Sequence, residues 1–192
     1  MDYRLYHYKD NNFNDIGFGC SYRNIQTILS CYKKHYDNNI RIPDVRELFF
    51  YFDTNYEEAI KNGFTMDLWI EPYQISQYLS DKFKINAYNI LYHIDDNYRK
   101  NILNTSINVY ESKTYSKHDI DIVSLLFERH FERSRLPVVI DDGIYSYCIC
   151  EIKNNELTIS DPHKTNDHEV LIIKPMSFLW ESFWMIYFPL NY

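Results

Sequence analysis

The strongest constraint on the fold is a change of periodicity near Leu136. Before this point, apart from a strand-like run at 85–92, apolar residues recur every three or four positions, which predicts amphipathic helices. After it they form short runs with a period of two, which predicts strands. The expected fold is therefore α+β, with helices packed on an antiparallel meander sheet.

Helices are expected from Cys20 to Tyr32, Pro43 to Phe52, Pro72 to Leu79 and Asp119 to Arg133. Strands are expected at 85–92, 136–140, 145–152, 157–160, 169–174 and 184–189, with a hairpin turn at Asn154-Asn155.

Length and charge narrow the class of protein. The 192 residues, 45% of them apolar, suit one domain over residues 1–192 around one core, and we see no repeat or linker. A net charge of −7 without a basic patch argues against nucleic-acid binding. No apolar run approaches the roughly 18 residues of a membrane span, so no membrane insertion is expected. We see no pattern that indicates a metal or another cofactor.

The N-terminus and the cysteines favour a reducing compartment. Met1-Asp2-Tyr3-Arg4 lacks an apolar signal-peptide core, so a cytosolic or nuclear protein is expected, with the cytoplasm preferred. Cys20, Cys31, Cys148 and Cys150 need not pair there. Abundant Asn, Ile, Lys and Tyr fit an AT-rich genome, such as that of a virus or protozoan. For a viral protein the expected location is the host cytoplasm.

Cys20 has the local setting of a thiol nucleophile. It follows the turn Gly17-Phe18-Gly19 and begins the first expected helix. Partial positive charge at a helix N-terminus favours the thiolate, and the two glycines let the backbone pass close to a substrate carbonyl. The same pattern also fits a small buried cysteine at a helix start, so a base is needed to decide between them.

His163 is the best-placed base among the seven histidines. It lies in Ser160-Asp161-Pro162-His163, just after an expected strand. Asp161 and His163 share one side of an extended chain, so the carboxylate can orient the imidazole. An ordinary Asp-Pro turn is the alternative interpretation. His7 is close to Cys20 in sequence but nothing there orients it. Four other histidines, at positions 35, 93, 118 and 130, are expected in helices or polar loops as surface or partly buried residues.

The segment from Tyr8 to Ser30 resembles the proteases specific for ubiquitin-fold modifier 1. Those enzymes carry a Tyr, eleven residues and then the nucleophile in Gly-Trp-Gly-Cys-x-Tyr-Arg-x-x-Gln-Thr. Their Asp-Pro-His matches Asp161-Pro162-His163, and weaker similarities occur at 67–70, 136–140 and the last strand. The matching residues of the first motif are Tyr8, Gly17, Gly19, Cys20, Tyr22, Arg23, Gln26 and Thr27.

The resemblance implies a papain-like cysteine protease fold without a cofactor. It implies that Cys20 is the nucleophile, His163 the base and later the acid, and Asp161 its orienting group. Tyr8 would donate its hydroxyl to the oxyanion, beside the Cys20 N–H. Gly19, Phe18 and Trp69 are expected to line a narrow channel for a substrate that ends in glycine.

This chain departs from the family pattern at several positions around the expected site. Phe18 replaces the family Trp, and Asp141-Asp142-Gly143 replaces a Gly-Gly-Gly loop. Tyr147 stands at about the position of the His that follows this loop, and is taken as a substrate-binding residue. Lys164-Thr165-Asn166 replaces a Tyr-Thr-Gly stretch.

The expected function is cleavage after the C-terminal glycine of a ubiquitin-like modifier. Ubiquitin-fold modifier 1 and its conjugates are the favoured partners, by thiol acyl transfer. The autophagy-related cysteine proteases share Gly-Trp-Gly-Cys and Asp-Pro-His, so the autophagy modifier or ubiquitin is the alternative substrate. Two further hypotheses are a weakly active protein that sequesters the modifier, and a thiol hydrolase or acyltransferase with an unrelated substrate.

Overall fold

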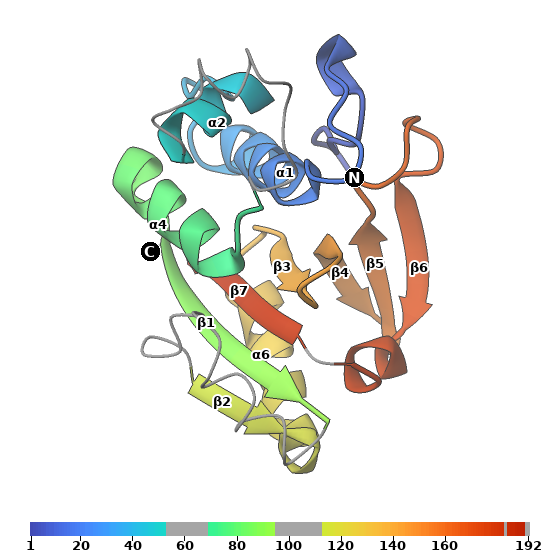
Figure 1. Cartoon of the computed structure of the whole chain (residues 1–192). Helices are drawn as coiled ribbons and strands as arrows, with labels where there is room; N and C mark the ends of the chain where they lie inside the picture. Colours follow the sequence, from blue (N-terminus) through green and yellow to red (C-terminus); the bar gives the residue numbers. More distant parts are fainter. Residues whose placement is uncertain (53–68, 95–112, 183, 191–192) are drawn as a thin grey trace.

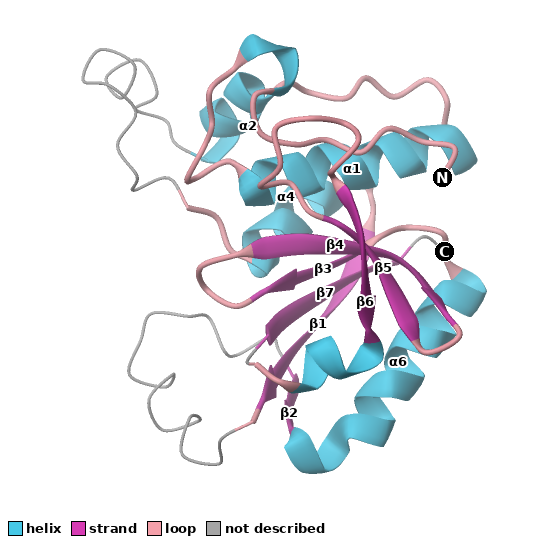
Figure 2. Ribbon diagram, turned by 90° about the vertical axis from the view of Figure 1, so that its right-hand side faces the viewer, coloured by secondary structure: helices cyan, strands magenta, loops and turns pink. Residues whose placement is uncertain are grey.

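A twisted sheet divides the molecule into two layers of helices. The computed structural model describes residues 1–52, 69–94, 113–182 and 184–190. In these residues seven strands pair in the order β2-β1-β7-β3-β4-β5-β6 (Figure 1). Helices α1, α2 and α4 lie on one face of the sheet, and α6 lies on the other (Figure 2).

The elements follow the expected positions within a few residues. The helices are α1 (Cys20–His35), α2 (Val45–Phe52), α4 (Pro72–Phe83) and α6 (Ile120–Arg133). Short 3-10 helices are η1 (Asp10–Asn12), η3 (Lys117–Asp119) and η4 (Met176–Trp180). The strands are β1 (Asn86–His93), β2 (Lys113–Ser116), β3 (Val138–Asp141), β4 (Ser146–Lys153), β5 (Glu156–Ser160), β6 (Leu171–Pro175) and β7 (Trp184–Leu190).

The meander is confirmed for β3 to β6, which pair antiparallel in chain order. The predicted hairpin turn is confirmed as well. Asn154 and Asn155 have φ values of 53° and 63°, the left-handed conformation that a two-residue hairpin turn of type I′ requires.

The expectation of a wholly antiparallel sheet is wrong at one edge. β1 and β2 are parallel, with Ile90 opposite Lys113. A parallel pair needs a connection of about a dozen residues or more, and the chain from 94 to 112 is long enough to provide it. β2 was not predicted because it is short and polar and lies at the edge of the sheet.

The last strand is inserted in the middle of the sheet rather than at its end. β7 pairs antiparallel with both β1 and β3, and residues 184–189 are all buried. Its apolar side chains face both layers, as expected for a strand covered on both faces. This position brings the early strand β1 and the late meander into one sheet.

Two hydrophobic clusters occupy the two faces, where the composition had suggested one core. The first joins α1, α2 and α4 to the sheet and includes Ile25, Phe49 and Tyr187. The second joins α6 and η4 to the other face and includes Phe127 and Ile186. Within the described ranges, no helix is both long and apolar enough to cross a membrane.

Helix α1 is the central helix of the first layer. Every residue from Cys20 to Cys31 is buried, including polar ones. The predicted stripe of Tyr22, Ile25 and Leu29 is confirmed as core, whereas Tyr32 is only partly buried. Because the polar side chains of α1 are also inside, each needs a partner there. Several of those partners belong to the segments that form the candidate site.

Candidate active site

Three segments that are far apart in sequence meet at the N-terminus of α1. Cys20 is the first residue of that helix, Tyr8 lies in the loop before it, and His163 follows β5. The backbone N–H of Tyr8 donates to the carbonyl of Pro162 over 2.8 Å. This bond joins the N-terminal loop to the loop between β5 and β6, and Figure 1 shows these two loops side by side.

His163 and Asp161 form the hydrogen-bonded pair that the sequence predicted. Nδ1 of His163 lies 2.7 Å from Oδ1 of Asp161, and the His163 backbone N–H donates to the same oxygen over 3.1 Å. Burial alone would raise the pKa of Asp161, but the bonds from His163 outweigh it and leave this pKa below its usual value. The carboxylate therefore stays ionised and holds the imidazole in one orientation.

The Cys20 thiol lies next to this imidazole. Burial lowers the pKa of His163, but the hydrogen bond to Asp161 and the interaction with Cys20 together raise it to about 9. Nε2 of His163 is buried and has no hydrogen bond of standard geometry among the described residues. Since Nδ1 is bound to Asp161, Nε2 is the ring atom left to exchange a proton with the thiol.

Tyr8 is the third group at the Cys20 sulfur. Its side chain is buried, and burial together with the interaction with Cys20 raises the pKa of its hydroxyl, which therefore stays protonated. A protonated phenol is a hydrogen-bond donor. The structure thus brings together all four predicted catalytic residues, namely Tyr8, Cys20, Asp161 and His163.

Three tyrosine rings surround the imidazole. The rings of Tyr8, Tyr145 and Tyr147 contact His163 edge to face, with centroid distances of 5.4, 5.2 and 5.1 Å. Tyr147, predicted to bind substrate, is therefore at the site. Tyr145 was missed, because its position depends on the tight turn at 142–145, where the Asp142 N–H donates to the Tyr145 carbonyl. Tyr145 is 49% exposed.

The other predicted substrate-binding residues have different surroundings. Phe18 is partly buried and packs on Phe49, with ring centroids 5.6 Å apart, so much of its ring belongs to the core. A Cβ on Gly19 would overlap the Asp15 carboxylate, so that missing side chain makes room for Asp15. Trp69 precedes α4, is 38% exposed, and makes no ring contact with His163 in the described part of the chain. Asp67 and Leu68 of the same segment lie outside the described residues.

A buried ion pair fixes the first turn of α1. Nε of Arg23 donates to Oδ2 of Asp15 over 2.6 Å, and both side chains are fully buried. The other guanidinium nitrogens donate to Oε1 of Gln26 and to the Asp10 carbonyl. Oδ1 of Asp15 accepts the Lys9 N–H, next to Tyr8. These bonds tie the Tyr8 loop to the helix that carries Cys20. A buried arginine requires a carboxylate, but the sequence could not say which one.

A second polar group lies one helical turn after Cys20. Nδ2 of Asn24 donates to Oγ of Ser146 over 2.9 Å, and Ser146 also interacts with the Asp141 carboxylate. Burial raises the pKa of Asp141 to about 6, although bonds from Gly143 and Ser146 partly oppose this. The departure from the family's glycine loop therefore places a buried acid at the end of β3.

Three histidines outside the site differ from the prediction. His93 ends β1 and is buried, and His130 on α6 is also buried. His7 is oriented after all, because Nδ1 contacts the Tyr8 carbonyl at 2.8 Å and Nε2 lies 3.0 Å from Oδ1 of Asp167. Ligand atoms of His7, Asp10 and Asp167 lie within 4.8 Å of one another and can hold a metal, although Arg4 already binds Asp10.

Comparison with known proteins identifies the family. Residues 1–180 match the family model of Peptidase family C78. A "Probable Ufm1-specific protease" of Oryza sativa subsp. japonica is 25% identical over 169 residues, which are 85% of this chain and 23% of that protein. The human "Ufm1-specific protease 2" is 25% identical over 179 residues, covering 89% of this chain and 33% of that protein.

A solved structure has the same fold. The crystal structure of UfSP from C. elegans matches with a TM-score of 0.67 at 22% identity, covering 99% of this chain and 33% of that one. The papain-like α+β fold implied by the resemblance is thereby confirmed. The chain spans about a quarter to a third of the length of these relatives. Since the family model covers nearly the whole sequence, the chain belongs to peptidase family C78.

Proposed function

We propose that this protein is a cysteine peptidase that cleaves after the C-terminal glycine of a ubiquitin-like modifier. Ubiquitin-fold modifier 1 and its conjugates are the favoured substrates, because relatives from rice and human are named as Ufm1-specific proteases. The observation that carries the proposal is the meeting of Cys20, His163 and Asp161 with the Tyr8 hydroxyl. We assign this activity to a single domain over residues 1–192, since the seven strands of the described residues share one sheet.

The geometry supports a two-step acyl transfer. Nε2 of His163 takes the proton of Cys20, and the thiolate attacks the glycine carbonyl. The Tyr8 hydroxyl and the backbone N–H of Cys20 donate to the developing oxyanion. The imidazolium then protonates the leaving amine, which leaves a thioester on Cys20. Water, deprotonated by His163, hydrolyses this thioester and releases the modifier with a free carboxylate.

The aromatic surroundings support a substrate that ends in glycine. Tyr8, Tyr145 and Tyr147 pack around the imidazole, and Cys20 itself is only 2% exposed. A residue without a side chain can reach such an enclosed sulfur, whereas a bulky one would have to displace these rings. No metal or cofactor has a role in this mechanism.

The cytoplasm, or the host cytoplasm for a viral protein, is the proposed location. All four cysteines are free and buried. Free thiols persist where the environment is reducing, and the mechanism needs Cys20 in its reduced form.

The test is covalent labelling with modifiers that carry an electrophile in place of the C-terminal carboxylate. A ubiquitin-fold modifier 1 probe should label the wild-type protein and fail to label Cys20→Ala. Cys31→Ser is the matched control, because Cys31 lies on the same helix and its Sγ contacts the Arg135 carbonyl at 3.0 Å. This variant should still be labelled. Equal labelling of Cys20→Ala would remove Cys20 from the role of nucleophile.

Parallel probes based on ubiquitin and the autophagy modifier identify the substrate. Preference for either would replace ubiquitin-fold modifier 1 in the proposal.

The buried position of Cys20 also fits the second candidate, a protein that sequesters the modifier without cleaving it. Turnover of a modifier fusion separates the two functions, because tight binding without cleavage would favour sequestration. If every modifier in the panel stays intact and unbound, an unrelated acyl substrate becomes the better hypothesis.

A further inference from the structure

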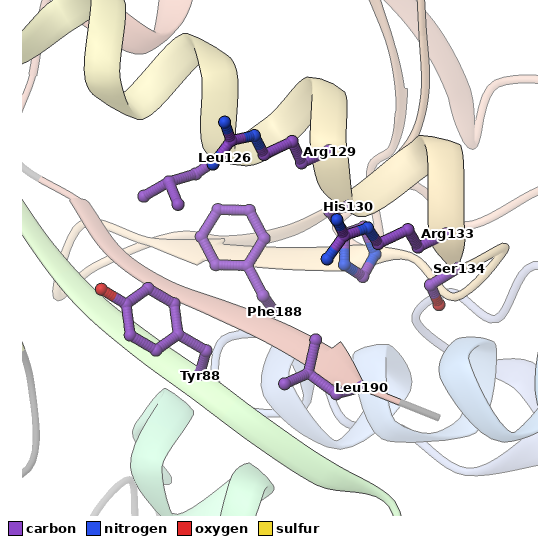
Figure 3. A pocket seen from close by; sticks show the side chains of 8 residues that line it. All are labelled: Tyr88, Leu126, Arg129, His130, Arg133, Ser134, Phe188 and Leu190. Atoms are coloured by element: carbon purple, nitrogen blue, oxygen red, sulfur yellow. The ribbon is translucent and has the colours of Figure 1, made fainter. Parts of the chain in front are cut away.

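A cavity of about 330 Å³ lies between α6 and the sheet, on the face opposite α1. Its volume is at the lower end of the range for sites that bind small molecules. Figure 3 shows the helix above the cavity and strands β1 and β7 below it. The cavity is lined by Tyr88, Leu126, Arg129, His130, Arg133, Ser134, Phe188 and Leu190.

The floor of the cavity is apolar. Phe188 and Leu190 of β7 lie in its base, with Tyr88 of β1 on one side and Leu126 of α6 above (Figure 3). The Phe188 ring is held by Phe127 and His130, with ring centroids 4.9 and 5.6 Å away. Such a floor suits an aromatic or short alkyl group, because both gain by leaving water.

The rim of the cavity carries two positive charges. Arg129 and Arg133 are exposed, and neither forms an ion pair with a carboxylate in the described residues. They are one helical turn apart, where two like charges repel each other. An anion between the two guanidinium groups would relieve this repulsion and accept charge-assisted hydrogen bonds. In a chain of net charge −7, such a local pair selects for an anionic ligand.

His130 lines the cavity and contains a buried hydrogen-bond acceptor. Its Nε2 lies 2.7 Å from the Leu136 carbonyl, which can only accept, so Nε2 carries the proton. Nδ1 is then an acceptor, and it is buried without a partner among the described residues. Burial lowers the pKa of His130, which keeps the ring neutral at neutral pH. A buried acceptor without a donor is costly, so a ligand that supplies an N–H or O–H would be stabilised.

We propose that this cavity binds a small anionic amphiphile. Its apolar body rests on Phe188 and Leu190, its acidic group lies between Arg129 and Arg133, and an N–H or O–H donates to Nδ1 of His130. The site is separate from Cys20, since α1 and α6 cover opposite faces of the sheet (Figure 2). It therefore does not depend on the proposed peptidase function.

The test uses 8-anilinonaphthalene-1-sulfonate, which combines aromatic rings, an N–H and a sulfonate, and fluoresces when it leaves water. Titration of the whole chain should give saturable binding at one site. The double variant Arg129→Gln/Arg133→Gln should weaken the affinity by about tenfold or more, as expected for the loss of charge-assisted bonds. Leu126→Trp, which fills the cavity without changing charge, should also abolish saturable binding.

Two controls separate the site from general charge and hydrophobicity. Arg41→Gln/Arg46→Gln removes the same charge near α2, on the other side of the sheet, and should change the affinity less than about twofold because distant charges are screened. The neutral N-phenyl-1-naphthylamine should bind wild type and Arg129→Gln/Arg133→Gln equally. Thermal melting verifies that each variant is folded. Absence of saturable binding to wild type, or equal sulfonate binding by the folded Arg129→Gln/Arg133→Gln variant, would overturn the proposal.

Discussion

Arg23 and Asp15 form a fully buried ion pair, with 2.6 Å between Nε and Oδ2. The pair links the helix that carries Cys20 to the loop that carries Tyr8, because Asp15 also accepts the Lys9 N–H. Removing one partner of a buried pair leaves an uncompensated charge, which typically costs about 3–5 kcal/mol. Arg23→Met should therefore lower the free energy of unfolding by about that amount, as measured by urea denaturation.

The double variant Asp15→Asn/Arg23→Met provides the control for this prediction. It removes the unpaired charge while keeping an acceptor for the Lys9 N–H, so it should recover part of the lost stability. A loss below about 1 kcal/mol in Arg23→Met would mean that water or another cationic group compensates the Asp15 carboxylate.

The bond between Asp161 and His163 should set the alkaline limit of activity. The active form pairs a thiolate with the imidazolium of His163, whose pKa is raised to about 9 by Asp161 and Cys20 against the effect of burial. Asp161→Asn removes the negative charge, so the alkaline limb of the pH profile of kcat/KM should move to lower pH. Asp167→Asn, in the same loop but paired with His7, should leave that limb in place.

The same pKa shift predicts how stability varies with pH. The folded-state pKa of His163 is above its unfolded value of about 6.5, so the pair stabilises the protein fully below that value. This contribution is lost as the pH rises through about 9. Urea denaturation from pH 6 to 10 should show the loss in wild type and a smaller one in Asp161→Asn. The same loss in both proteins would contradict the assigned cause.

Tyr8 should act on the transition state rather than on substrate binding. Its hydroxyl is protonated and adjacent to the Cys20 sulfur. Removal of one oxyanion donor typically lowers kcat by roughly a hundredfold or more. Tyr8→Phe should therefore reduce kcat to that extent with little change in KM, measured with a fluorogenic modifier substrate. Tyr6→Phe is the matched control from the same buried loop, and its kcat should remain near that of wild type.

The residues that could be predicted are those with a local pattern. Cys20 follows two glycines at a helix start, and Asp161-Pro162-His163 follows a strand. Each candidate could therefore be proposed from its neighbours in the sequence alone. Tyr8 has no such pattern and entered only through the family resemblance. In the same way, the helices and the β3–β6 meander follow from periodicity, whereas the parallel pairing of β1 with β2 does not.

The missed residues depend on contacts between distant segments. Asp15 acquires its role from the buried Arg23, which stands eight positions later in the sequence. Tyr145 reaches His163 because the turn at 142–145 folds its ring back toward the site. Asp141 is buried because β3 runs beside β4, which brings Ser146 opposite it. Each of these relationships arises from tertiary packing rather than from local sequence.

Asp141 should make the protein less stable at neutral pH than at mildly acidic pH. Burial raises the pKa of its folded-state carboxyl to about 6, above the unfolded value of about 3.9. The stabilising contribution of the protonated acid is present below about pH 4 and is lost as the pH rises through about 6.

Asp141→Asn keeps an acceptor for the Gly143 N–H but never ionises. Since each pKa unit corresponds to about 1.4 kcal/mol, Asp141→Asn should exceed wild type in unfolding free energy by about 1–3 kcal/mol at pH 8. Urea denaturation should show this difference shrinking as the pH falls below 6. A variant that is less stable than wild type at pH 8 would mean that the ionised Asp141 stabilises the turn at the end of β3.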